Sequence, residues 1–455
     1  MKIIIDLQGL QISGNRKRGI GRYSLELTKA LIHYYPENEY TLFTNSALFD
    51  LKNDFANELN NKKFKLHYFE CPTVGDLNES YRGRFSSLWS SIQLRSYALS
   101  IINADIILIT SFFDGFRDNT VVSHDKCFKL PPIVSILYDL IPLINSDQYL
   151  NIDPEFKLFY LQKINEMQSL DGLLTISKSS LMEASKYLKI NPENIFNISS
   201  ACDITKFSNY LTNDIIDKKY LGRFLLYCGN RDPRKNLYRL IEAYASLPFG
   251  LILKHKLVLT GPYTREEILL IQEWMITCDL PLEYVIFLGF VTDIELANLY
   301  RNCHLLIFPS LHEGFGLPVL EAMNFGAPVI ASNITSLPEL IGDHKFLFDP
   351  KNVKDIARLI TKTLVDDKFY QDLCSNSRER AKYFSWQSTA QRTIDSLKNI
   401  LDSKSILQDR DERNFISFID TQYHILLKNF IESPLLKLIN KPNVKYLKSL
   451  ASAIS

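Results

Sequence analysis

Cysteine is scarce and scattered in this sequence of 455 residues. The seven cysteines form no C-x-x-C pair and their number is odd, which favours neither a disulfide framework nor a zinc site. No uncharged apolar run approaches the roughly 20 residues that cross a bilayer, and Asp6 follows only three isoleucines at the amino terminus. We therefore expect reduced thiols, no export signal and a cytoplasmic chain whose membrane contact, if any, is peripheral.

An excess of charge of either sign is also missing. The 52 Lys and Arg residues balance 51 Asp and Glu residues, for a formal net charge of +1. Such a chain has no overall field that attracts a nucleic-acid backbone, which argues against a dedicated nucleic-acid binder. The hydrophobic content of 46% and the charged content of 23% are typical of folded proteins and exclude wholesale disorder.

What the sequence does contain is two series of short apolar runs that alternate with helical patterns. This alternation predicts an α/β fold with two doubly wound parallel sheets. The expected domains are residues 1–205 and 206–403, joined through a polar linker at 203–220, with a last helix at 386–401. The predicted strands lie at residues 3–5, 40–43, 106–109, 133–137 and 173–176 in the first series, and at 224–227, 257–259, 285–288, 305–308 and 329–331 in the second.

Residues 404–455 form an appendage beyond the second series. A charge cluster at 409–413 is followed by residues 428–455, which carry five lysines against one glutamate, interleaved with leucine and isoleucine. Two interpretations stay open: a basic helix pair that lies on an acidic surface, or an accessory helical hairpin or stub of a longer chain.

A glycine-rich loop follows the apolar run at 305–308. Residues 314–317 precede Pro318, which suits the first position of a helix. Backbone amides at a helix N-terminus attract anions and hydroxyl-rich ligands. Glu313 stands before the helix and Glu321 one turn inside it, so a ligand crossing the loop can meet one carboxylate with each end. The alternative is that the glycines only form a tight turn and that the two glutamates only stabilise the N-terminus of the helix.

A wider string of motifs surrounds this loop: Phe-Leu-Gly-Phe-Val at 287–291, Leu-Tyr at 299–300, Phe-Pro-Ser at 308–310 and Gly-Ala-Pro-Val-Ile-Ala-Ser at 326–332. This string resembles the donor-nucleotide half of the retaining glycosyltransferases of family 4. The resemblance implies the GT-B fold, in which two Rossmann-like domains face a cleft, here with a helical C-terminal appendage.

The resemblance also assigns roles to residues of the second half. Glu313 looks like the family glutamate that meets the transferred sugar, and Glu321 like the one that holds the ribose diol. Backbone groups near Gly289 and Phe290 are expected to recognise the base. The implied donor-binding residues in this half are Gly289, Phe290, Gly314, Phe315, Gly316, Leu317 and Glu321.

Residues 227–236 are similar to the family loop whose basic side chains bind the donor diphosphate. Lys235 matches best. Many relatives have an arginine directly after the glycine, where this chain has Asn230, so the second cation is either Arg231 or Arg234. The alternative is that these charges belong to a solvated turn.

No metal or other cofactor is expected. The only D-x-D string lies at 409–411, in the charged segment after the last predicted helix. Transferases that use a metal clamp the diphosphate with a carboxylate-bound cation. Cationic side chains are expected to replace that cation here.

The first half carries two further matches. The opening through Gly19, Gly21 and Arg22, which leads into a helix, resembles bacterial family members that build polysaccharides, notably polymannose O-antigen mannosyltransferases. There, this loop faces the donor phosphates and the acceptor. Asp139 matches a family His-Asp pair in which this chain has Tyr138. Residues 177–180 are expected to cap a helix.

The predicted function is retaining transfer of a hexose, mannose in first place, from a nucleotide sugar to a growing bacterial surface polysaccharide. GDP-mannose is the first choice of donor and a UDP-hexose the second. The expected partners are the nucleotide sugar, a glycan or lipid-linked glycan acceptor, and an assembly complex or the inner membrane surface. Three alternatives stay open: a sugar-nucleotide epimerase, a phosphorylase, and a non-catalytic nucleotide-sugar-binding module.

Overall fold

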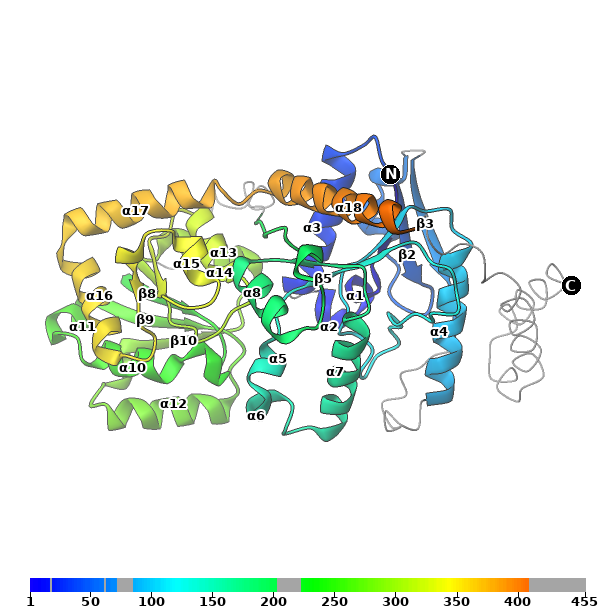
Figure 1. The fold of residues 1–455 in the computed structure, drawn as a ribbon. Helices are drawn as coiled ribbons and strands as arrows, with labels where there is room; N and C mark the ends of the chain where they lie inside the picture. Colours follow the sequence, from blue (N-terminus) through cyan, green and yellow to red (C-terminus); the bar gives the residue numbers. More distant parts are fainter. Residues whose placement is uncertain (17–18, 61–62, 72–84, 203–221, 409–455) are drawn as a thin grey trace, which may run out of the picture.

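Two parallel β-sheets, each flanked by helices, organise the chain into two α/β domains (Figure 1). The computed structural model describes residues 1–16, 19–60, 63–71, 85–202 and 222–408. The predicted α/β fold class is confirmed. The expected linker and most of the appendage lie outside the described residues.

The first sheet has seven described strands in the order β3-β2-β1-β4-β5-β6-β7, and every recorded pairing is parallel. Side chains alternate between its two faces: Ile3 and Ile5 enter one buried cluster, and Ile4 the other. Burial on both faces explains why these strands are continuous apolar runs. The strands are β1 (Lys2–Asp6), β2 (Glu39–Asn45), β3 (Phe64–Phe69), β4 (Ile106–Ile109), β5 (Ile133–Leu137), β6 (Gly172–Thr175) and β7 (Ile195–Asn197).

The second sheet has six described strands in the order β10-β9-β8-β11-β12-β13, again with parallel pairings. In both sheets the strand order reverses direction beside the first strand, at β1/β4 and at β8/β11. Ligands of open α/β sheets bind outside the carboxyl ends of the strands at such switch points. The strands are β8 (Arg223–Cys228), β9 (His255–Thr260), β10 (Val285–Gly289), β11 (Leu305–Phe308), β12 (Val329–Ser332) and β13 (Leu347–Phe348).

All ten predicted strands are present, and the three that the sequence did not predict, β3, β7 and β13, are sheet edges. An edge strand is open on one side, so its residues need not form a buried apolar run. In β3, for example, Phe64 and Phe69 are buried while Lys65 and Tyr68 are exposed.

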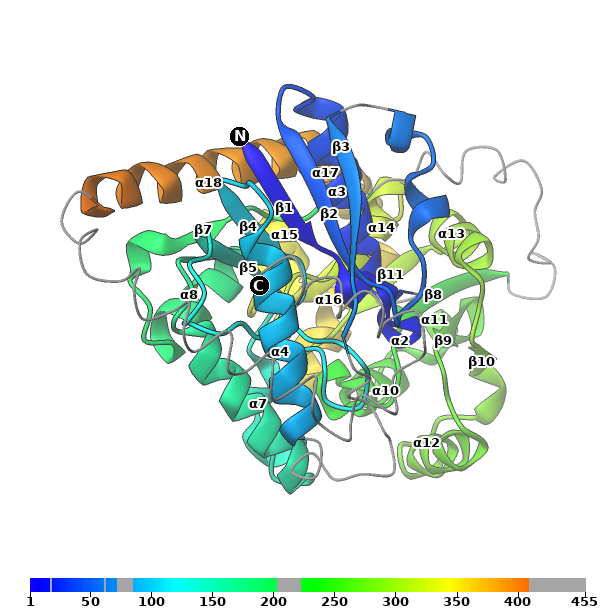
Figure 2. The same cartoon turned by 90° about the vertical axis from the view of Figure 1, so that its right-hand side faces the viewer.

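Helices connect the strands of both sheets (Figures 1 and 2). Reciprocal capping boxes begin two of them: Thr264 with Glu267, and Thr292 with Glu295. The helices of the first domain are α1 (Gln8–Gln11), α2 (Ser13–Arg16), α3 (Gly19–Tyr34), α4 (Phe85–Ser100), α5 (Ile141–Ile144), α6 (Ser146–Tyr149), α7 (Pro154–Met167) and α8 (Lys178–Tyr187). The later helices are α10 (Leu237–Ala245), α11 (Phe249–Lys254), α12 (Arg265–Thr277), α13 (Asp293–Asn302), α14 (Leu317–Asn324), α15 (Leu337–Ile341), α16 (Val353–Val365), α17 (Asp367–Ala381) and α18 (Trp386–Gln408).

Helix α18 leaves the second domain and returns to the first, where it packs against α3 and β6 (Figure 1). Ile400 is 1% exposed, and a Cβ atom added at Gly172 of β6 would stand 2.5 Å from its Cδ1 atom. From the sequence, residues 206–403 were expected to form the second domain. By its contacts, however, α18 belongs to the core of the first domain.

Among the helices of the described residues, none has the length and apolar character that crossing a membrane needs.

Ile400→Ala tests this packing. We expect the free energy of unfolding to fall by about 2–5 kcal/mol, because the smaller side chain leaves a cavity over Gly172. Lys398→Ala, on the exposed side of the same helix, is the control and should change stability by less than about 0.5 kcal/mol. Urea unfolding measures both variants, and equal effects would contradict the assignment of α18 to the first-domain core.

Candidate active site at the domain boundary

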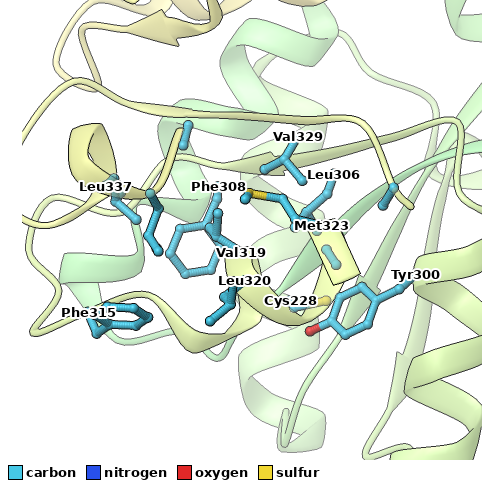
Figure 3. Close-up of a cluster of buried hydrophobic side chains, with 14 of the residues drawn as sticks. Cys228, Tyr300, Leu306, Phe308, Phe315, Val319, Leu320, Met323, Val329 and Leu337 are labelled. Atoms are coloured by element: carbon cyan, nitrogen blue, oxygen red, sulfur yellow. The ribbon is translucent and has the colours of Figure 1, made fainter. Parts of the chain in front are cut away.

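The predicted two-glutamate loop lies at the carboxyl end of β11 and leads into α14. Helix α14 begins at Leu317, one residue earlier than predicted, after Gly316 with a φ of 102°. A side chain at Gly316 would be strained by that φ and would come within 2.8 Å of Leu337. Figure 3 shows α14 anchored by Val319, Leu320 and Met323 among buried side chains of the second domain. The loop therefore projects from a rigid support.

Glu313 is held between two cations. Its Oε1 atom accepts a hydrogen bond from Lys235 Nζ at 2.6 Å, and its Oε2 atom one from Arg234 Nη1 at 3.0 Å. The Glu313 side chain is only 9% exposed. Burial alone would raise the pKa of Glu313, but the charges of Lys235 and Arg234 outweigh it and lower the pKa. Glu313 is therefore a buried, ionised carboxylate.

The turn that carries these cations is tied to the glutamate loop. Asp232 caps it by accepting from the Arg234 amide. Asn236 adopts a left-handed conformation with φ 58°, and its side-chain amide donates to the carbonyls of Pro309 and Pro350. Because β8 and β11 are neighbours, two segments about 80 residues apart in sequence meet at the switch point.

The two candidate arginines differ in their contacts. Arg234 contacts Glu313, and Glu313 and Asp232 raise its pKa although burial opposes them. Arg231 instead donates from Nε to the Tyr238 hydroxyl at 2.9 Å. The structure thus brings Arg234 to the carboxylate and directs Arg231 to Tyr238.

Glu321, inside α14, is partly buried, with a side chain 14% exposed. The Tyr300 hydroxyl donates to its Oε2 atom at 3.2 Å, and Arg22 Nη1 lies 3.5 Å from its Oε1 atom. Burial raises the pKa of Glu321, against the opposing effects of Arg22 and Tyr300. Arg22 comes from α3 of the first domain and also lies 3.8 Å from Asp293. The predicted residues Arg22 and Glu321 therefore meet across the domain boundary.

Two predicted glycines, Gly314 and Gly21, stand where a side chain does not fit, and a third, Gly19, stands where one would be tight. A Cβ atom at Gly314 would lie 2.5 Å from the carbonyl oxygen of Tyr138 and 3.1 Å from Asp139 Cβ. A Cβ atom at Gly19 would lie 3.2 Å from Leu317 Cδ1, and one at Gly21 would lie 2.4 Å from the Asn15 carbonyl oxygen of α2. Gly314 and Gly19 thus allow the first domain to approach the glutamate loop.

Asp139 lies beside that loop, at the end of β5. Burial raises its pKa, while a hydrogen bond from the Ile141 amide and the charge of Arg234 lower it. Ser180 of α8 donates to the carbonyls of both Tyr138 and Gly314. As predicted, the 177–180 segment caps α8, with the Ser177 hydroxyl accepting from the Ser180 amide.

The remaining predicted donor residues have different environments. Gly289 has a φ of 68°, and its carbonyl accepts from the Gly261 amide at 2.9 Å. The Phe290 side chain is 81% exposed, whereas Phe315 is 3% exposed and packs edge to face on Phe384. The Phe315 side chain is therefore a core group, and only its backbone can face a ligand.

The sequence did not reveal a chain of two hydrogen bonds that crosses the domain boundary beside Glu313. Asn145 Nδ2 lies 3.3 Å from His312 Nδ1, and His312 Nε2 lies 2.8 Å from Glu183 Oε1. Because an amide NH2 group donates, Nδ1 is the acceptor and Nε2 carries the hydrogen that Glu183 accepts. The only sequence signal was the place of His312 directly before Glu313; Glu183 is one acid among many on helices.

The first domain also buries polar groups that the sequence did not mark. Arg95 and Asp6 form an ion pair at 2.6 Å with side chains 0% and 1% exposed. Asp114, beyond β4, accepts from Asn15 Nδ2 at 2.7 Å. Burial raises the Asp114 pKa to about 6, although hydrogen bonds from Ser111 and Asn15 oppose the rise.

Within the described residues, no group of three or more His, Cys, Asp or Glu side chains is arranged to hold a metal ion. The groups that the described residues bring to the boundary are carboxylates, cations and helix-terminal amides. These groups suit a ligand with a hydroxyl-rich part and an anionic part.

Comparison with known proteins assigns the class. Residues 215–380 match the family model "Glycosyl transferases group 1". The whole described fold resembles that of Anabaena Alr3699/HepE, solved in complex with UDP and glucose, with a TM-score of 0.58 and 20% identity over 88% of this chain and 99% of that one. Residues 215–380 therefore carry a group 1 glycosyltransferase domain within a GT-B-like fold, which confirms the resemblance predicted from the motifs.

Two relatives from Escherichia coli are named as mannosyltransferases. The serotype-specific mannosyltransferase WbdA is 35% identical over 413 residues, which cover 89% of this chain but 48% of WbdA. The O-antigen chain mannosyltransferase B is 29% identical over 84% of this chain and 96% of its own length. The chain thus spans about half the length of WbdA and nearly all of the second relative.

Asp114→Asn tests the electrostatics of the first domain. A carboxyl group whose pKa is raised in the folded state binds its proton more tightly there, so wild-type stability falls as pH rises from about 4 to 6. The variant removes this loss, and we expect it to be more stable than wild type by about 1–3 kcal/mol above pH 6 and not at pH 4.

Urea unfolding between pH 4 and 8 measures this difference. Asp50→Asn is the control, because a hydrogen bond from Tyr68 lowers the Asp50 pKa and the variant should not gain stability with pH. A stability gain for Asp114→Asn that is independent of pH would contradict the explanation.

Proposed function

We propose that the chain transfers a hexose, mannose in first place, from a nucleotide sugar to a bacterial surface polysaccharide, with retention of the anomeric configuration. The observation that carries this proposal is the buried Glu313 carboxylate between Lys235 and Arg234, at the switch point of the second sheet. The names of the two E. coli relatives support the hexose and the polysaccharide.

In this proposal the second domain holds the donor. Lys235 and Arg234 neutralise the diphosphate, with the helix-terminal amides of α14 as further donors. Glu321 accepts from the ribose diol once Arg22, now 3.5 Å away, turns toward the phosphates. Glu313 accepts from hydroxyls of the transferred hexose.

The chemical step follows from these positions. The acceptor oxygen forms a bond to the anomeric carbon while the bond from that carbon to the diphosphate oxygen breaks on the same face. The proton of the acceptor hydroxyl passes to the departing diphosphate, so no protein nucleophile is needed. Lys235 and Arg234 stabilise the negative charge that grows on the leaving group, and Glu313 stabilises positive charge on the sugar.

In this proposal the loop with Gly19 and Gly21 faces the donor phosphates and the acceptor, and Asp139 lies beside the transferred sugar. The contact between Gly314 and the backbone of Tyr138 brings the two sides together and excludes water from the transfer. Contact with an anionic membrane surface is proposed for the segment 428–455, which carries five lysines and one glutamate and lies outside the described residues.

Alanine variants of the charged cluster test the mechanism. We expect Glu313→Ala, Lys235→Ala and Arg234→Ala each to reduce kcat at least 100-fold, because each loses a preorganised charge worth about 3 kcal/mol in the transition state. Transfer of radiolabelled mannose from GDP-mannose to mannan-type acceptors measures the loss.

Arg231→Ala is the matched control in the same turn. Its guanidinium contacts Tyr238 and not Glu313, so we expect less than about a fivefold loss. Circular dichroism checks that all four variants fold. Equal losses for Arg231→Ala and Arg234→Ala would overturn the assignment of the second cation.

Thermal shift with a panel of nucleotides and nucleotide sugars tests the donor. GDP-mannose and GDP should raise the midpoint, since a ligand that binds only the native state stabilises it, and they should do so in the presence of EDTA. Protection by UDP-sugars alone would overturn GDP-mannose as the donor. A shift that needs magnesium or manganese would contradict binding by cationic side chains, and conversion of the donor without acceptor would favour an epimerase.

A further inference from the structure

The hydroxyl of Tyr300 contacts Glu321, the carboxylate that the proposed function assigns to the ribose of the donor. It donates to the Oε2 atom of Glu321 at 3.2 Å. Tyr300 lies in α13 and is 1% exposed, whereas the side chain of Glu321 in α14 is partly exposed. Tyr300 is therefore too deeply buried to contact a ligand, but it can orient a group that does.

The ring of Tyr300 lies on a rigid support. It stacks on Phe325 at the C-terminus of α14, with ring centroids 6.2 Å apart and ring planes inclined by 20°. Figure 3 shows the Tyr300 hydroxyl pointing toward Cys228, the last residue of β8. A tyrosine has only two side-chain torsions, and close packing restricts both of them. The hydroxyl is therefore a fixed donor for Glu321.

The two oxygens of Glu321 have different neighbours. Oε2 is held by Tyr300 from the same domain, while Oε1 lies 3.5 Å from Arg22 of the first domain. The Arg22 side chain is partly exposed and also lies 3.8 Å from Asp293, so a ligand can replace its contact with Glu321. In the proposed function Arg22 turns toward the phosphates. Tyr300 then remains on Oε2, and Oε1 becomes free.

The same hydrogen bond favours the ionised form of Glu321. Burial raises the pKa of Glu321, whereas Arg22 and the Tyr300 hydroxyl lower it. An ionised carboxylate can only accept hydrogen bonds, and both hydroxyls of a ribose diol can donate to it. A carboxylate with a fixed orientation and charge therefore distinguishes ribose from 2′-deoxyribose, which lacks one of these donors.

We propose that Tyr300 is a positioning residue that gives the donor site its preference for ribonucleotides over deoxyribonucleotides. Tyr300 holds one oxygen of Glu321, and this fixes the direction in which the carboxylate accepts from the ribose diol. The inference rests on the proposed binding of a nucleotide sugar, and within it on the assignment of Glu321 to the ribose. It concerns binding alone, so its test needs no transfer reaction.

Two tyrosine variants separate positioning from stability. Tyr300→Phe removes only the hydroxyl and keeps the ring that stacks on Phe325. Tyr244→Phe is the matched control, because Tyr244 is also fully buried in the second domain and its hydroxyl donates to the His255 carbonyl at 2.7 Å. Each variant loses one buried hydrogen bond, so each should lower the melting temperature. Only Tyr300→Phe should change the response to the ribose hydroxyls.

Calorimetry on the full chain gives the ratio of the Kd of 2′-deoxy-GDP to the Kd of GDP, and the same ratio for the uridine nucleotides. For the base that the wild type binds, we expect the ribonucleotide to be preferred about 10- to 100-fold. Tyr300→Phe should reduce this ratio about three- to tenfold through weaker binding of the ribonucleotide, and Tyr244→Phe should leave it unchanged. In a Glu321→Ala background, Tyr300→Phe should not change the ratio further, because it acts through the carboxylate.

A ratio for Tyr300→Phe within about 1.5-fold of the wild-type ratio would overturn the inference. Equal weakening of both nucleotides would overturn it too, because that is the result of a merely structural role. Failure of Tyr300→Phe to fold, with Tyr244→Phe folded, would likewise assign the hydroxyl to the fold and not to the ribose.

The proposed function is judged separately from this inference. If Glu321→Ala loses the preference while Tyr300→Phe keeps it, the ribose assignment of Glu321 stands and the role of Tyr300 falls. If Glu321→Ala also keeps the preference, both the ribose assignment and the role of Tyr300 fall. Transfer of mannose by a wild type without any preference for the ribonucleotide would leave the transfer standing and overturn the inference.

Discussion

The buried carboxylate of Glu313 needs both of its cations. Bringing a charge out of water into a domain boundary costs several kcal/mol unless opposite charges and hydrogen bonds compensate. Lys235 and Arg234 supply that compensation, one on each oxygen. This constraint fixes the turn after β8 against the loop after β11, and with it the N-terminus of α14. A ligand that brings its own negative charge can share the same cations.

The first domain forms hydrogen bonds with polar groups of the glutamate loop in the second domain. Helix α8 is central to this contact, because Ser180 donates to Gly314 and Glu183 accepts from His312. Glu339 of α15 reciprocates by accepting from the Lys178 amide at the N-terminus of α8, where a negative charge is stabilising. These contacts fix the position of the glutamate loop relative to Asp139, so the donor and acceptor sides form one site.

The first domain buries a charged pair at the carboxyl end of its first strand. Asp6 and Arg95 are almost completely buried, and their ion pair together with the hydrogen bond from Gln8 to Asp6 compensates the buried Asp6 carboxylate. Such a cluster belongs to the architecture at the end of β1.

Sequence alone determined the elements whose signal is local. Central strands such as residues 106–109 are read from buried apolar runs, and the loop from Glu313 to Glu321 from its glycines and its proline. The edge strands, the return of α18 to the first domain and the choice of Arg234 over Arg231 depended on tertiary structure. So did the contact of Glu183 with His312, which joins residues 129 apart in the chain. Local patterns encode burial and backbone conformation, but which charges meet is decided by sheet order and domain packing, because these bring distant segments within hydrogen-bond distance.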